Sequence, residues 1–231
     1  MKVDLSKYKD EWYKENPAKN IFPGPVVTIS REMGCPAKQI AGLLADELNK
    51  LRKTSRAKEH EWRWISKEIL SESAKELNAD YEQIEHIFHY KNRNVLEDIL
   101  LAQSKDYYKS DLKIRTTIAK VIRSFANKGN AIIVGRGGVA ITRDIPKSFH
   151  IMLEAPLEWR AVRTSTKHNI PLDQARNYAQ SIDKKRAQFR DYFQGKGNDY
   201  TRFDMKLNCM TLEVEEIVQI IIGALKASKL I

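Results

Sequence analysis

The chain has 231 residues, with 40 Lys or Arg against 30 Asp or Glu and a formal net charge of +10. This length allows one α/β domain with insertions, and the charge favours anionic partners such as nucleotides, nucleic acid or acidic lipid without choosing among them. No apolar run approaches the roughly 20 residues of a membrane-spanning helix, so we expect a cytoplasmic protein with no membrane partner.

Residues 1–25 are polar with aromatic insertions, and we expect them to form an arm laid against the core. Residues 26–48 then read as a buried strand that turns through Gly34 into an amphipathic helix, because β-branched residues give way to apolar residues at helical spacing. A loop at such a junction points backbone N–H groups and the positive end of a helix dipole at one spot. The segment therefore suits a bound phosphate.

The loop departs from the phosphate-loop pattern G-x-x-x-x-G-K-[ST]. Its sequence is Gly34-Cys35-Pro36-Ala37-Lys38-Gln39, with Arg31 three residues before the glycine. Pro36 removes one N–H group, Gln39 offers no hydroxyl for magnesium, and Lys38 is the only cation in the turn. From this segment alone, a plain strand–turn–helix unit of an α/β protein stays open as an alternative.

The two cysteines, Cys35 and Cys209, could in principle pair, but nothing else in the sequence resembles a disulfide scaffold or a metal site, and we interpret both as reduced thiols. Cys35 would be reactive if it lay at a helix N-terminus.

Further along, strands and helices alternate. We predict strands at 62–65, 131–134, 149–153 and 205–210, and helices at 67–77, 81–126, 157–167, 172–193 and 214–230, with a charged segment at 51–61. This order favours a mostly parallel sheet, in which ligands gather at the carboxyl ends of the strands. Those ends carry Arg31, Arg136 and Glu154. His150 lies within an apolar strand, which is more typical of a satisfied buried histidine than of a catalytic base.

Five segments stand in a characteristic order: VTISREMG, IIVGRG, APLEWR, SIDKKRAQFRDYF, and a short strand with a closing helix. Over about 26–228 this order resembles the cytidylate-kinase-like family of phosphate-loop nucleoside monophosphate kinases. The resemblance implies an α/β fold of the three-layer phosphate-loop NTPase type, with a mostly parallel sheet flanked by helices. It further implies one kinase-like domain at 26–231, with a helical acceptor-binding insertion at 66–126 and an arginine-rich lid at 160–200. ATP and Mg2+ would be the cosubstrates, and the phosphate acceptor would be CMP or a related nucleotide.

The resemblance also assigns site residues. Arg136 and Asp183 with Arg186 would bind the acceptor, and the catalytic cations would be Lys38, Arg136 and Arg163. ATP would lie on Arg160 and the loop residues Arg31, Gly34, Cys35, Pro36, Ala37, Lys38 and Gln39. Cys35, Pro36 and Ala37 stand where relatives have Ser, Gly and Gly, Lys38 replaces Arg, and Val134 replaces an acidic residue before the Gly-Arg pair.

Other interpretations stay open. Arg160 and Arg163 lie three apart on one helix, where an ion pair with Glu158 or a neighbouring helix is ordinary, and residues 183–186 could be a solvated face. The Trp62 and Trp64 pair could stack bases, although we expect the two rings to lie on opposite faces of a sheet. The altered loop leaves room for a weak or inactive nucleotide-binding relative, or for a basic nucleic-acid or protein interaction module. The sequence fixes neither the acceptor nor the oligomeric state.

Overall fold

The computed structural model describes residues 25–54, 61–66, 69, 71, 73, 75, 105–194 and 202–231, without the side chains of 54, 105–112 and 194. The arm predicted at 1–25, apart from Pro25, almost all of the insertion at 66–126 before residue 105, and the end of the lid at 195–200 lie outside the described residues. Among the described helices, none is long and apolar enough to span a membrane.

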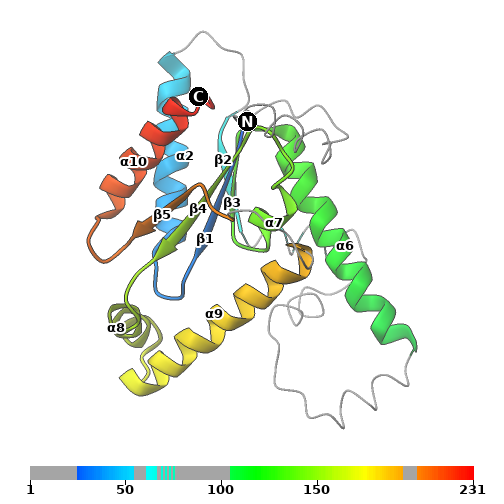
Figure 1. Ribbon diagram of the computed structural model, residues 1–231, viewed down its shortest axis with the longest axis vertical. Helices are drawn as coiled ribbons and strands as arrows, with labels where there is room; N and C mark the ends of the chain where they lie inside the picture. The colour runs from blue at the N-terminus through cyan, green and yellow to red at the C-terminus, as the bar shows by residue number, and fades with distance from the viewer. Residues whose placement is uncertain are drawn as a thin grey trace, which may run out of the picture.

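A five-stranded sheet with every strand parallel forms the centre of the molecule (Figure 1). The strand order is β2-β3-β1-β4-β5, so the first strand lies in the middle. The strands are β1 (Val26–Arg31), β2 (Arg63–Ile65), β3 (Ala131–Val134), β4 (Ser148–Glu154) and β5 (Met205–Asn208). All four later strands lie where the sequence predicts them, and the predicted parallel sheet is confirmed.

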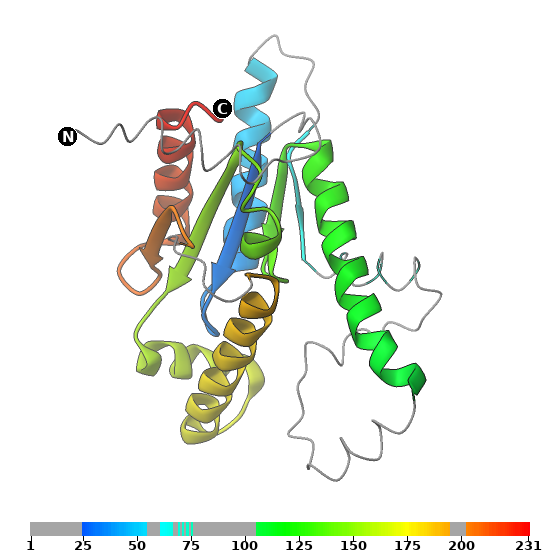
Figure 2. The ribbon, with the colours of Figure 1, turned by 45° about the vertical axis from the view of Figure 1, so that its right-hand side comes forward.

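Helices cover both faces of this sheet (Figure 2). One face carries α2 (Ala37–Thr54) and α10 (Val214–Ala227), and the other carries α6 (Lys105–Lys128) and the short α7 (Gly138–Ile141). The side chains of β1 alternate between the two layers, since Val27 and Ile29 join the core under α2 whereas Val26 joins the core under α6. The predicted three-layer α/β architecture is therefore present.

Two further helices lie across the carboxyl ends of the strands (Figure 1). They are α8 (Leu157–His168) and α9 (Leu172–Gln194), which pack against each other. Pro171 precedes α9, as expected for a residue that can start a helix but not continue one. This pair closes the edge of the sheet at which ligands are expected.

Three side chains of the interior, His150, Trp62 and the partly buried Trp64, test the sequence interpretation. His150 is a satisfied core residue, because its Nδ1 lies 2.8 Å from the Thr28 hydroxyl and its Nε2 lies 3.1 Å from the Ser148 hydroxyl. The expectation for Trp62 and Trp64 is wrong: both rings pack into the same core under α2, since residues two apart on an extended chain point to the same side.

Candidate functional site

A cavity of about 250 Å³ opens where β1 and β3 end beneath α9. Its wall comes from three segments that are distant in sequence: the end of β1, the turn after β3, and one side of α9. The lining residues are Ser30, Arg31, Met33, Gly135, Arg136, Gly137, Tyr178, Ile182, Lys185, Arg186, Phe189 and Arg190.

The turn after β3 is shaped to admit the Arg31 side chain. Gly135, Arg136 and Gly137 all have positive φ, at 72°, 56° and 74°. A Cβ atom on Gly135 would lie 1.7 Å from Nη1 of Arg31, so the guanidinium passes directly over the bare glycine backbone. Arg186 holds the end of β1 in place, because its Nη1 donates to the Arg31 carbonyl oxygen at 3.2 Å.

The cavity is strongly cationic. Five of its lining side chains are basic, and among the residues that the structure describes no carboxylate lines it. Burial lowers the pKa of Arg31 to about 9, with further lowering from Arg186, Arg136 and Arg190, and Asp183 opposes the shift only in part. Arginine side chains gathered in this way repel each other, and a bound oxyanion would relieve that repulsion through charge-assisted hydrogen bonds.

The loop between β1 and α2 lies beside this cavity and uses several of its own N–H groups internally. The Met33 N–H donates to Oδ1 of Asp183 (2.7 Å), that of Cys35 to the Glu32 carbonyl (3.3 Å), and that of Ala37 to the Cys35 carbonyl (3.0 Å). Fewer N–H groups are therefore available to a phosphate than an open glycine-rich loop would offer.

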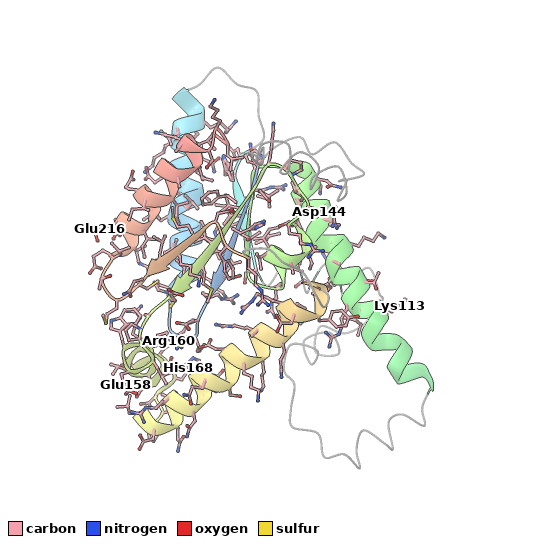
Figure 3. All side chains as sticks on the ribbon, viewed as in Figure 1. Lys113, Asp144, Glu158, Arg160, His168 and Glu216 are labelled. Atoms are coloured by element: carbon pink, nitrogen blue, oxygen red, sulfur yellow. The ribbon has the colours of Figure 1, made fainter. Side chains whose placement is uncertain are left out.

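Arg160 holds this loop in place. Its Nε lies 2.8 Å from the Ala155 carbonyl and 3.1 Å from Glu32, and its Nη1 lies 2.7 Å from Asp183 and 3.2 Å from the Met33 carbonyl. The side chain is only 8% exposed. Of the two ion pairs considered for Arg160, the one with a neighbouring helix is present through Asp183 on α9, whereas Glu158 pairs with Arg176 (2.8 Å). Figure 3 shows Arg160 on the side of α8 nearer the strands.

Arg163, one turn further along α8, also contacts the loop. Its Nε donates to the Gly34 carbonyl at 3.2 Å, and its guanidinium lies 4.7 Å from the centre of the Trp159 ring. Gly34 fits closely here, because a Cβ atom would lie 2.8 Å from the Arg160 carbonyl oxygen.

The predicted site residues thus fall into three groups. Arg31, Arg136 and Arg186 meet in the cavity, and Asp183 lies at its edge, 3.7 Å from Arg186. The alternative of a solvated face is wrong for Asp183 and Arg186, which are 21% and 26% exposed. The second group, Gly34, Cys35, Arg160 and Arg163, forms the loop and its supports. The third, Pro36, Ala37, Lys38 and Gln39, begins α2 outside the cavity lining, with Lys38 and Gln39 exposed.

Sequence reasoning missed Lys185, Arg190 and the aromatic lining residues of α9. Their signal is the spacing of Tyr178, Ile182, Lys185 and Phe189, which recur three or four residues apart on one side of a long helix, with Arg190 four residues after Arg186.

Comparison with known proteins agrees with this geometry. The model of the "Cytidylate kinase-like family" matches residues 55–211, which is more than half of the chain. The chain belongs to the cytidylate kinase-like family. The match begins after the loop at 31–39, so the loop that differs from the phosphate-loop pattern lies outside the matched segment. No curated protein matches the sequence.

Solved structures share the fold at low sequence identity. An uncharacterised protein from Eubacterium ventriosum is 20% identical, with a TM-score of 0.60 over 88% of this chain and 98% of that one. Shikimate kinase from Bacteroides thetaiotaomicron is 13% identical (TM-score 0.51, 87% and 98%), and shikimate kinase from Acinetobacter baumannii, in complex with shikimate, is 15% identical (0.50, 93% and 100%). The fold is that of the phosphate-loop kinases, and the family supports a nucleotide kinase type of function.

Proposed function

We propose that this protein transfers the γ-phosphate of ATP to a nucleoside monophosphate of the cytidylate type, with the acceptor's phosphate held in the arginine-lined cavity. The observation that carries the proposal is the convergence of Arg31, Arg136 and Arg186 on a cavity at the carboxyl ends of parallel strands, which no carboxylate lines within the described part of the chain. Phosphoryl transfer needs mainly positioning and cations around developing negative charge.

The remaining walls suit a nucleoside. Ile182, Phe189 and Tyr178 offer apolar and aromatic surface beside the basic groups, and Tyr178 is 40% exposed. We propose that the base and ribose lie along this side of α9, with residues 160–200 as the lid and residues 66–126 completing the acceptor site within a kinase domain at 26–231.

ATP would bind on the loop side, near Lys38 and Arg163. The residues present fit phosphate oxygens better than a protein-held metal ion: Gln39 supplies no hydroxyl, and Glu32 and Asp183 are both paired with Arg160. Magnesium, which the family implies, would then enter bound to the nucleotide phosphates.

An ADP-release assay with ATP, magnesium and a panel of nucleoside monophosphates tests the proposal, with thermal shift measured on the same ligands. Arg136→Ala should weaken acceptor binding about 10- to 100-fold, as the loss of one charged hydrogen bond predicts. Lys185→Ala and Lys184→Ala form a matched pair, because Lys185 lines the cavity whereas Lys184 is exposed. Equal effects of these two variants, or no effect of Arg136→Ala, would refute the site.

One observation favours a second candidate, a nucleotide-binding protein without turnover. The N–H groups of Met33, Cys35 and Ala37 are already hydrogen-bonded inside the protein. Stabilisation by nucleotides without ADP release from any acceptor would select this second candidate.

A further inference from the structure

The two cysteines of the chain lie side by side in the fold. Cys35 belongs to the loop after β1, Cys209 follows β5 directly, and their thiols are joined by a side-chain hydrogen bond. Both are free thiols; Cys209 is buried in the core under α2, and the partly exposed Cys35 packs against that core.

Hydrogen bonds to the end of β4 bring the two cysteine segments together. Strand β4 separates β1 from β5, and the residues that follow β1 and β5 both bond to the end of β4. There the Glu32 N–H donates to the Leu153 carbonyl (3.0 Å), and the Ala155 N–H donates to the Glu32 carboxylate (3.1 Å). On the far side, the Cys209 N–H donates to the Glu154 carbonyl at 2.9 Å. Each cysteine is thus anchored to the same strand end.

We propose that Cys35 and Cys209 are a redox pair that forms a reversible disulfide and thereby ties the loop at 31–39 to the end of β5. With hydrogen peroxide as oxidant, one thiolate attacks an oxygen atom and breaks the O–O bond, which leaves a sulfenic acid and, after protonation, water. The second thiolate attacks that sulfur and releases the sulfenic oxygen as a second water. Two thiols and one peroxide therefore give one disulfide and two waters, and a dithiol reductant reverses the change.

The surroundings favour Cys209 as the first thiolate. The hydrogen bond from Cys35 lowers the pKa of the Cys209 thiol, the charge of Arg163 lowers it further, and the same hydrogen bond raises the pKa of Cys35. Arg163 is held at this point by its bond to the Gly34 carbonyl, the residue next to Cys35.

Oxidation would move the loop. A disulfide brings the sulfur atoms to about 2.05 Å, closer than a hydrogen-bonded pair, and so draws Cys35 towards β5. Gly34 cannot follow freely, because it already fits closely against the Arg160 backbone. We expect oxidised protein to bind ATP more weakly, and this consequence rests on the proposed function, whereas the disulfide itself does not.

The test is thiol counting on the intact, folded chain. After stoichiometric peroxide and then iodoacetamide, we expect no alkylated cysteine and a mass lower by two hydrogens, with two alkylations restored by dithiothreitol. The same treatment in urea should be much slower to form the intrachain bond, and Cys35→Ser and Cys209→Ser should each retain one alkylated thiol. Two free thiols after oxidation, disulfide-linked dimers only, or equal rates in folded and unfolded chain would overturn the proposal.

A second measurement tests the effect of the disulfide on ATP binding separately from the formation of the disulfide. Reduced and oxidised protein are compared for ATP binding by titration calorimetry, and a drop of about tenfold or more on oxidation supports regulation. Equal affinities would overturn the regulatory role, and absence of ATP binding in the reduced protein would instead refute the proposed function.

Discussion

Replacement of Arg160 by methionine tests whether this arginine stabilises the fold or binds the ligand. Met keeps much of the side-chain volume but removes the charge, and so leaves Glu32 and Asp183 without their partner at 3.1 and 2.7 Å. Breaking one side of a buried ion pair costs about 3–5 kcal/mol. The two carboxylates are 28% and 21% exposed, so solvent screening reduces this cost, and we expect a loss of about 2–4 kcal/mol.

The assay is urea unfolding, with thermal unfolding as a second readout. At this chain length, the expected loss of unfolding free energy corresponds to a thermal unfolding midpoint lower by roughly 5–15 °C. The stability of Arg160→Lys should lie between those of wild type and Arg160→Met, since the lysine ammonium keeps the charge but not the planar, forked donor geometry of the guanidinium. Arg176→Ala is the matched control, because that arginine pairs with exposed carboxylates on the outside of the same two helices, and its unfolding midpoint should not change. Wild-type stability in Arg160→Met together with lost nucleotide binding would refute this reasoning.

Three further predictions concern the cavity and the core. Gly135→Ala should weaken phosphate binding, measured by calorimetry, at least tenfold, because the new Cβ displaces the Arg31 guanidinium. Gly223→Ala on α10 is the control and should leave the affinity unchanged, because its Cβ meets open space. Equal phosphate affinities of the two variants would contradict the cavity geometry. Arg31→Met should weaken phosphate binding by calorimetry at least tenfold, because it removes the guanidinium that lines the cavity beside Gly135; an unchanged affinity would exclude Arg31 as a ligand. Burial lowers the pKa of His150 from 6.5 to about 4, so stability is fully present above pH 6.5 and declines by about 3 kcal/mol as the pH falls towards 4. Urea unfolding of His150→Gln across this range should show a shallower pH dependence, and an identical one would point to another group.

Much of the fold was predictable because its signals are local. The strand at 131–134 is apolar at every position, and the β-branched run at 26–29 follows Pro23-Gly24-Pro25, which interrupts regular structure, so both strands were placed from the sequence. The rule that ligands gather at the carboxyl ends of parallel strands then placed Arg31 and Arg136 together. Both residues line the cavity.

The remaining features depend on strand order and side-chain direction, which periodicity does not encode. Helix α9 is charged around much of its circumference, so spacing alone could not tell that Lys185 faces the cavity while Lys184 faces outward. The contact between Cys35 and Cys209 follows from β4 lying between β1 and β5, an order that no local pattern fixes.

The arginines at this end of the sheet divide according to where the carboxylates lie. Glu32 and Asp183 both contact Arg160, so that its charge is matched and the loop is fixed to α8. At the edge of the cavity, Asp183 lies 3.7 Å from Arg186. Its negative charge offsets only part of the positive charge around Arg31. A buried cation is stabilised by a counter-charge, and among the described residues Asp183 supplies only part of it to Arg31, so we propose that a bound anion supplies the rest. The proposed phosphate site therefore rests on this difference between Arg160 and Arg31, rather than on the number of arginines.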